Sequence, residues 1–303
     1  MLITKLDNVE VNIEDGHKYA ARDIVKGENI IKYGQPIGHA TEDIKKGEHV
    51  HTHNVKTNLS EKLEYTYAPV ELKNEKIDTD LTFEGYIREN GEVGIRNDVW
   101  IVNTVGCVNK IAEKLAQQTG AKHFPHPFGC SQLNEDQGVT QKILRGLVNH
   151  PNAGGILVLG LGCENNNIDV FKGVLGEWNE KRVRFLNTQD VEDEIEAGIA
   201  IIRELQEYAS TFKKQPIPVS KLKVGLKCGG SDGYSGITAN PLVGRFSDLL
   251  VAQGGTTVLT EVPEMFGAEH LLMERCPEEE TFQKTVHLIN DFKAYFLRHG
   301  QVV

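Results

Sequence analysis

Short β-branched runs separated by glycine turns dominate the first 60 residues. The segment Asp23–Ile30 (Asp-Ile-Val-Lys-Gly-Glu-Asn-Ile) is echoed by Asp43–Val50 (Asp-Ile-Lys-Lys-Gly-Glu-His-Val). Each copy places a Lys-Gly turn between short apolar runs, which predicts two similar β-hairpins. We therefore predict a small all-β domain over residues 1–60.

The pattern changes twice further along the chain. Residues 61–82 are polar and charged with little periodicity, which predicts a linker. Beyond them, buried-strand patterns alternate with helical ones, and the alternation predicts parallel βαβ units. The strands are expected over 99–105, 155–159 and 183–186, and the helices over 109–118, 136–149 and 190–213. We assign 83–218 to a first α/β domain, in which Gln215-Pro216-Ile217-Pro218 should break the last helix.

Residues 219–303 repeat the strand and helix alternation on a smaller scale. Strands are expected over 222–226 and 256–259, and a further helix over 264–274. Between the strands, Asn240 and Pro241 have the features of a helix cap and first turn. Apolar residues at helical spacing predict the core faces of this helix (Leu242, Phe246, Leu249, Leu250) and of a terminal one (Phe282, Val286, Ile289, Phe296). The fold class is therefore α/β, with a small all-β domain in front of a parallel-sheet body.

Composition and charge narrow the classes of function. The 303 residues carry a formal net charge of -10, which argues against nucleic-acid binding because that needs clustered Lys and Arg. No run approaches the roughly 20 apolar residues of a membrane span, and the first residues do not resemble a signal peptide. We expect a cytoplasmic protein with a small-molecule substrate and no membrane partner, and we leave a homo-oligomer open.

Three of the five cysteines stand where an apolar run ends in a glycine turn: Cys130, Cys163 and Cys228. Loops at the carboxyl ends of parallel strands commonly form active sites, and thiols there suggest a soft or borderline metal. Their wide spacing lacks the compact pattern of iron–sulfur motifs. The alternative is that they are small buried hydrophobic residues.

Histidines offer a second set of metal ligands. His49, His51 and His53 alternate, so on an extended strand their imidazoles would project from one face. We predict His51 and His53 as ligands, with His17 as a third. The alternative is a surface histidine cluster with no ligand.

Polar loops supply candidates for substrate contact and proton transfer. Gly229 and Gly230 expose backbone N–H groups suited to a carboxylate, and Ser231 and Asp232 follow them, with Asp232 as base or ligand. Alternatively, Asp232 hydrogen-bonds its own turn. No complete Gly-x-Gly-x-x-Gly or phosphate-loop motif is present, which argues against a nucleotide cofactor.

A second group of polar residues lies in the first α/β domain. Glu164, Asn165 and Asn166 form a polar loop suited to sugar hydroxyls, with Glu164 as a further catalytic candidate. Arg96 and Asn97 could clamp a carboxylate. Their alternative role is hydrogen bonding at a domain interface.

Several motifs together resemble the altronate/galactarate dehydratase family. They are Lys227-Cys-Gly-Gly-Ser-Asp-Gly-Tyr-Ser-Gly-Ile-Thr-Ala-Asn-Pro241, His49-Val-His-Thr-His-Asn54, Gly94-Ile-Arg-Asn97, Thr104-Val-Gly-Cys-Val-Asn109, Phe128-Gly-Cys-Ser-Gln-Leu133 and Gly160-Leu-Gly-Cys-Glu-Asn-Asn166. They span nearly the whole chain in the family's order. The stretch Gly254–Glu269 is more similar to the altronate branch than to the galactarate branch.

The resemblance implies an N-terminal SAF (β-clip) domain and elimination of water from D-altronate to give 2-dehydro-3-deoxy-D-gluconate. It also implies ferrous iron as cofactor, with manganese as a substitute. Relatives continue past the terminal helix into a region with an Asn-Pro-Ser-Pro-Gly-Asn-Lys-like motif that has no counterpart here, so we expect a chain shortened relative to the family. The alternatives are a dehydratase for galactarate, elimination from a sulfonated hydroxy acid, and a non-catalytic protein that binds sugar acids.

Overall fold

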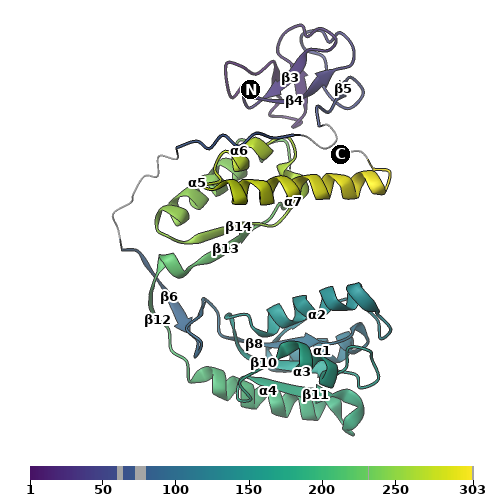
Figure 1. Ribbon diagram of the computed structural model, residues 1–303, viewed down its shortest axis with the longest axis vertical. Coiled ribbons are helices and arrows are strands. Elements are labelled where there is room, and N and C mark those ends of the chain that lie inside the picture. Colours follow the sequence, from purple (N-terminus) through teal and green to yellow (C-terminus); the bar gives the residue numbers. More distant parts are fainter. Residues whose placement is uncertain (60–63, 72–79, 231, 302–303) are drawn as a thin grey trace. The chain divides into compact units, whose positions relative to one another are not determined.

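The computed structural model describes residues 1–59, 64–71, 80–230 and 232–301, and the chain divides into two units (Figure 1). The first unit combines Met1–Asp80 with Leu222–Val303, and the second is Leu81–Lys221. Much of the linker predicted over 61–82 lies outside the described residues. No helix within the described ranges is long and apolar enough to cross a membrane.

The first unit begins with a small β module, in agreement with the sequence. Strand β1 (Val9–Val11) pairs antiparallel with β2 (Lys18–Ala20), while β3 (Asn29–Lys32), β4 (Gln35–Ala40) and β5 (Val55–Lys56) form an antiparallel sheet. Buried aliphatic side chains fill its core (Val9, Ala20, Ile24, Ile30, Ala40, Ile44, Val50).

The internal repeat pairs with itself instead of forming two separate hairpins, so that detail of the prediction was wrong. Ile24 and Ile44, equivalent positions in the two copies, exchange both backbone hydrogen bonds, at 2.9 and 2.8 Å. Asp43 accepts from the backbone of Lys26 and Asp23 from that of Lys46. Each copy therefore closes the turn of the other.

The second unit is built around a parallel sheet, as the alternation of elements predicted. Its strand order is β11 (Val183–Asn187), β10 (Ala153–Gly160), β8 (Asp98–Asn103) and β9 (Lys122–Phe124). Four α-helices belong to this unit: α1 (Asn109–Thr119), α2 (Asn134–Val148), α3 (Ile168–Leu175) and α4 (Glu194–Ser210). The strand β9 and the helix α3 were not anticipated from the sequence.

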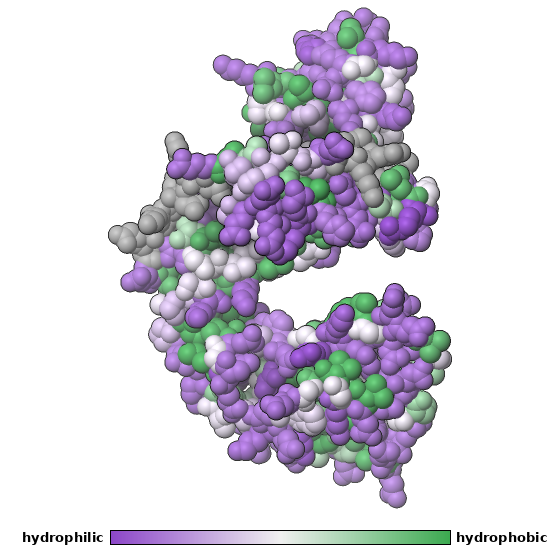
Figure 2. Space-filling view, viewed as in Figure 1, coloured by the Kyte–Doolittle hydropathy of each residue, from purple (hydrophilic) through white to green (hydrophobic). Residues whose placement is uncertain are grey.

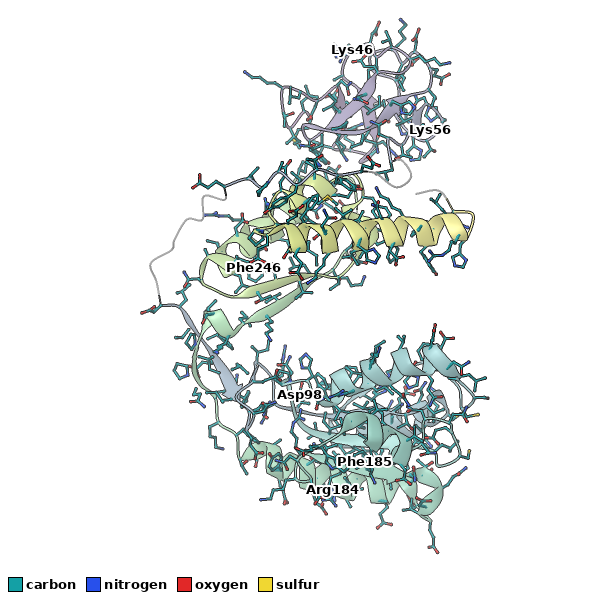
Figure 3. The ribbon with its side chains drawn as sticks, in the orientation of Figure 1. Lys46, Lys56, Asp98, Arg184, Phe185 and Phe246 are labelled. Carbon is teal, nitrogen blue, oxygen red and sulfur yellow. The ribbon has the colours of Figure 1, made fainter. Side chains whose placement is uncertain are left out.

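Alternation along the strands assigns these helices to two faces of the sheet. Val99 and Ile101 pack with α1 and α4, whereas Trp100 and Val102 pack with α2 and α3. The edge strand β11 alternates in the same way, as its consecutive residues Arg184 and Phe185 show (Figure 3). Arg184 is exposed and forms an ion pair with Glu204, while Phe185 is partly buried. The result is a three-layer α/β/α body.

The segment Gln215–Pro218 is strand β12, not a simple helix break. It pairs antiparallel with β6 (Thr82–Ile87), which also pairs with β7 (Val93–Gly94). Proline lacks an N–H group but is tolerated on an edge strand, which is where β12 lies. The sequence prediction took the prolines only as a stop signal and missed the pairing.

The C-terminal part of the first unit has two parallel strands, β13 (Lys223–Leu226) and β14 (Thr256–Leu259), with α5 (Ala239–Ala252), α6 (Glu269–Met273) and α7 (Glu279–Arg298) (Figure 1). Phe282 and Ile289 of α7 are buried, as predicted. Tyr65 and Tyr67, inside the predicted linker, pack in the same cluster as Phe282.

Three details of this region differ from the sequence prediction. Helix α5 has Thr238, not Asn240, at its N-cap position. Of its predicted core face only Leu250 is buried, while Leu242 is 72% exposed, because the two-stranded sheet offers little surface to cover it. Phe246 of this face is labelled in Figure 3 and is also exposed. The helix expected over 264–274 is interrupted at Gly267, whose φ of 86° is outside helical geometry.

Candidate functional site

Glu164 organises the loop that follows β10 in the second unit. Its side chain is buried and accepts hydrogen bonds from the Thr104 hydroxyl at 2.5 Å, from Leu161 N at 3.1 Å and from Gly162 N at 2.7 Å. Burial alone would raise the pKa of Glu164, but these donors outweigh it and the net pKa is lowered. The carboxylate therefore holds a negative charge and shapes its own loop.

The neighbouring asparagines connect this loop to two others. Asn165 N donates to the Cys130 carbonyl at 2.9 Å, and Asn166 is buried, with its side chain bonded to Thr104 O and to Gln141. The loops after β8, β9 and β10 are therefore joined at one edge of the sheet, as expected for the carboxyl ends of parallel strands.

Three polar side chains at this edge contain buried atoms that have no hydrogen-bond partner among the described residues: Asn103 Oδ1, His126 Nδ1 and Asn187 Oδ1. Asn103 ends β8 and Asn187 ends β11, while His126 follows β9 and bonds to Asn103 O through Nε2 at 3.1 Å. Buried polar atoms are normally satisfied, so such a group suggests contact with a ligand or water. Sequence reasoning missed these residues, although a polar residue at the end of an apolar strand was the available signal.

Cysteines and a cavity lie at the same edge. Cys130 and Cys163 are exposed, as is Cys107 in the loop after β8, so these thiols are not the buried hydrophobic residues of the alternative interpretation. Gly129 and Ser131, which stand on either side of Cys130, line a cavity of about 590 Å³ together with Thr140 of α2. Its volume is within the range of small-ligand pockets.

Arg96 and Asn97 lie at the opposite edge, so the structure does not bring them together with Glu164. They precede the first residue of β8, and a six-residue strand spans about 20 Å. The Asn97 side chain accepts from Arg88 at 2.7 Å and donates to Ala209 O at 2.7 Å, while Arg96 is exposed. Asn97 thus serves hydrogen bonding within the second unit.

The glycine loop, residues 227–238 of the first unit, contains the next group of candidates. Gly229 and Gly230 are exposed, and a Cβ at either would meet no atom within 4 Å. Asp232 Oδ1 accepts from Tyr234 N at 2.8 Å and Ser235 N at 3.0 Å, and Cys228 N donates to Glu261 at 2.6 Å. Ser231 lies outside the described residues. Asp232 is exposed and closes a turn through one of its oxygens.

The predicted histidines gather in the β module, although not on an extended strand. The chain turns at residues 51–54, where Asn54 is buried, accepts from His51 N at 3.0 Å and donates to His49 O at 2.9 Å. The strand geometry behind the prediction was therefore wrong. The four rings are nevertheless close together: the ring centroid of His49 lies 5.0 Å from that of His17, 5.6 Å from that of His51 and 5.7 Å from that of His53.

The imidazole nitrogens of this histidine cluster (His17, His49, His51 and His53) are suitable ligands for iron, but they are not arranged around one point. His49 Nε2 is buried and has no hydrogen-bond partner in the part of the chain that the structure describes, and burial followed by repulsion from the other three rings lowers the pKa of His49. Neutral imidazole nitrogens are common ligands of iron. Within the described residues, however, no three His, Cys, Asp or Glu side chains converge on one point.

Comparison with known proteins shows one family along the chain. Three family models match: "Altronate/galactarate dehydratase SAF domain" at residues 4–58, "D-galactarate dehydratase/Altronate hydrolase, second domain" at 85–210, and "D-galactarate/Altronate dehydratase, C-terminal" at 219–303. The three matches follow the order of the motifs.

Individual relatives are similar over most of the chain. It is 55% identical over 97% of its length to altronate dehydratase of Bacillus subtilis (strain 168), and 49% identical over 98% to altronate dehydratase of Escherichia coli (strain K12). It is 35% identical over 72% of its length to (2R)-sulfolactate sulfo-lyase subunit beta of Chromohalobacter salexigens. The chain spans 62%, 63% and 56% of these relatives, respectively.

Proposed function

The chain belongs to the D-galactarate/altronate dehydratase family, and we propose that it takes part in a metal-dependent elimination of water from D-altronate to give 2-dehydro-3-deoxy-D-gluconate. The observation that carries this proposal is 55% identity over 97% of the chain to an altronate dehydratase. We also propose a cytoplasmic location, since Cys107, Cys130, Cys163 and Cys276 form no disulfide within the described residues.

The reaction needs a base for the proton beside the carboxylate, an acid for the leaving hydroxyl, and groups that stabilise the negative charge. Asp232 is the candidate base that we favour, because it is exposed on a glycine-rich loop. Glu164 is a weak base, because it already accepts three hydrogen bonds. We assign it the role of holding the loop that carries Cys163 and Asn165.

The polar edge of the second unit is a candidate surface for the sugar hydroxyls. Asn103 and Asn187 have buried side-chain carbonyl oxygens with no partner within the described residues, and such acceptors can receive hydroxyl hydrogen bonds. The 590 Å³ cavity against the Cys130 loop can accommodate a six-carbon acid.

For the metal we propose His17, His51 and His53, with His49 beside them. A bound divalent ion would neutralise charge on the substrate carboxylate. Ferrous iron is the ion that we favour, with manganese as a substitute. In the described residues, however, no three of these side chains converge on one point.

A second candidate reaction keeps the elimination and changes the leaving group. The relative that is 35% identical is named for sulfolactate, a sulfonated hydroxy acid. Galactarate is a third candidate, because all three family models carry both acids in their names.

Anaerobic turnover assays test the proposed function. The purified chain, alone and fused to the part of the Bacillus subtilis relative that it does not cover, would be incubated with Fe²⁺ and D-altronate, galactarate or sulfolactate. We expect 2-dehydro-3-deoxy-D-gluconate from altronate at the highest kcat/KM. Failure of both proteins to dehydrate altronate would refute the substrate assignment.

Matched variants test the base and the ligands. Asp232→Asn should lower kcat by about 10² to 10⁴, whereas Asp169→Asn, an exposed aspartate on α3, should have no effect. His51→Ala and His53→Ala should lower the bound iron measured by elemental analysis, with His287→Ala of α7 as control. Unchanged iron content would remove these histidines from the metal site.

A further inference from the structure

Tyr33 occupies a backbone position that normally suits asparagine or glycine. It links β3 to β4 together with Gly34, and both residues have positive φ, 58° and 77°. Two-residue hairpin turns with positive φ at both positions favour Asn-Gly. A tyrosine in this conformation costs about 1 kcal/mol or more. Such a cost is tolerated where the side chain has a use that asparagine or glycine could not serve.

The Tyr33 ring lies against the glycine loop of the same unit. Its hydroxyl donates to Gly233 O at 3.0 Å, and a Cβ on Gly236 would come within 2.3 Å of its Cε2 atom. Glycine is therefore the only residue that fits at position 236 beside this ring. Burial, followed by the charges of Asp7 and Asp232, raises the pKa of Tyr33, which is consistent with Asp232 lying nearby.

A second tyrosine makes the reciprocal contact. Tyr234 belongs to the loop, and its hydroxyl donates to the backbone carbonyls of Ile13, at close range, and of Asn12, at 3.4 Å. A Cβ on Gly233 would come within 2.4 Å of Gly16 O. The loop and the β module are thus held together by one tyrosine from each side and by glycines with no room for a side chain.

We propose that Tyr33 and Tyr234 are positioning residues, which fix the glycine loop against the β module so that Asp232 and the exposed Gly229 and Gly230 amides keep the geometry that turnover needs. This inference rests on the proposed function for the role of Asp232, but the anchoring itself can be measured without it. A purely adhesive contact would stabilise the unit without affecting the loop or catalysis.

The test is a double-mutant cycle between Tyr33 and Gly236. Gly236→Ala places a methyl group against the ring, and Tyr33→Asn removes the ring while giving the turn a residue that it favours. Gly173→Ala in α3, where a Cβ would meet nothing within 4 Å, is the control. Amide hydrogen exchange of residues 232–238, the thermal midpoint, and kcat and KM for altronate are measured for each variant of the full chain.

We expect exchange of the loop amides to quicken about 3- to 10-fold in Tyr33→Asn, the equivalent of losing one hydrogen bond. The double variant should resemble Tyr33→Asn, because the clash of Gly236→Ala exists only when the ring is present. The value of kcat should fall by about the same factor as the exchange rate of the loop amides rises, and the thermal midpoint should not change. Tyr234→Phe should act in the same direction.

Three results would overturn the proposal. Additive effects of the two substitutions would mean that ring and glycine are not coupled. Unchanged exchange in Tyr33→Asn would mean that the loop is not anchored there, and faster exchange with unchanged kcat would exclude a positioning role. If neither the wild-type chain nor its fusion shows turnover, the proposed function fails, and the exchange cycle alone decides whether the tyrosines anchor the loop.

Discussion

Burial and hydrogen bonding act in opposite directions on Glu164, and the hydrogen bonds win. A carboxylate in an apolar environment normally becomes harder to ionise, but a hydroxyl and two backbone amides donate to this one. The sequence made Glu164 a candidate acid or base. In the structure its carboxylate instead holds its own loop in place through these hydrogen bonds. Its negative charge stabilises the fold only while it stays ionised.

Thr104→Val should destabilise the protein by about 2 kcal/mol at pH 7, because it removes a hydrogen bond to a charged group. Since the folded-state pKa of Glu164 is lowered from 4.5, its contribution is fully present above the unfolded-state pKa and is lost as pH falls through the folded-state value. The difference between variant and wild type should therefore shrink below about pH 4.5.

Urea unfolding at pH 7 and at pH 3.5 measures this difference. Thr104→Ser, which keeps the hydroxyl, is the matched control and should be close to wild type at both pH values. An equal cost of Thr104→Val at the two pH values would show that the hydroxyl does not act through the Glu164 charge.

At the scale of elements, one buried ion pair joins α6 to α7. Lys293 Nζ lies 2.7 Å from Glu269 Oε1, with side-chain exposures of 1% and 5%, and 3.4 Å from the Tyr65 hydroxyl. Burial would raise the pKa of Glu269, yet hydrogen bonding to Lys293 leaves it lowered overall. The pair therefore fixes how the short helix packs on the long one.

Glu269→Gln should cost about 3 to 5 kcal/mol, because it leaves the Lys293 ammonium buried without a compensating charge. Glu280→Gln breaks an ion pair on the same helix α7 whose side chains are 72% and 74% exposed, and should cost under about 1 kcal/mol. Thermal and urea unfolding compare the two. The double variant Glu269→Leu/Lys293→Met should recover most of the loss, and equal costs of the two single variants would contradict the assignment.

At the scale of the whole molecule, the second unit is a continuous segment inserted into the first. The chain enters it through β6 and leaves through β12, and these strands pair side by side, with Thr82 opposite Pro218. The first unit is made of two separate stretches of chain. A segment whose ends meet in this way can fold without the sequence on either side of it.

The fragment of residues 81–221 should therefore fold on its own, with a cooperative thermal transition by circular dichroism. A shorter fragment of residues 98–210 lacks β6 and β12, and with them Ile217, which is 2% exposed. Its free energy of unfolding should be lower than that of the longer fragment by about 2 to 5 kcal/mol or more, because removing one buried aliphatic side chain usually costs that much. The absence of a cooperative transition in the longer fragment would show that the second unit depends on the first.

The sequence by itself determined the classes of element and much of their order. A continuous apolar run specifies the strand β8, and helical spacing of apolar residues specifies α7, because both patterns depend only on which side chains are buried together. The cysteine turns and the glycine loop were also visible, because chemically distinctive residues lay next to apolar runs. The strand β12 was hidden, because its prolines carry a local stop signal that the pairing with β6 overrides.

Tertiary structure alone decided which polar residues meet. Arg96 and Glu164 both looked suitable for a substrate, yet they lie at opposite edges of one sheet, and strand direction sets that separation. The histidines cluster through a turn closed by Asn54, and the partners of Tyr33 lie about 200 residues away in the chain. Hydrogen bonds and steric exclusion act through space, so a pattern read along the chain cannot anticipate them.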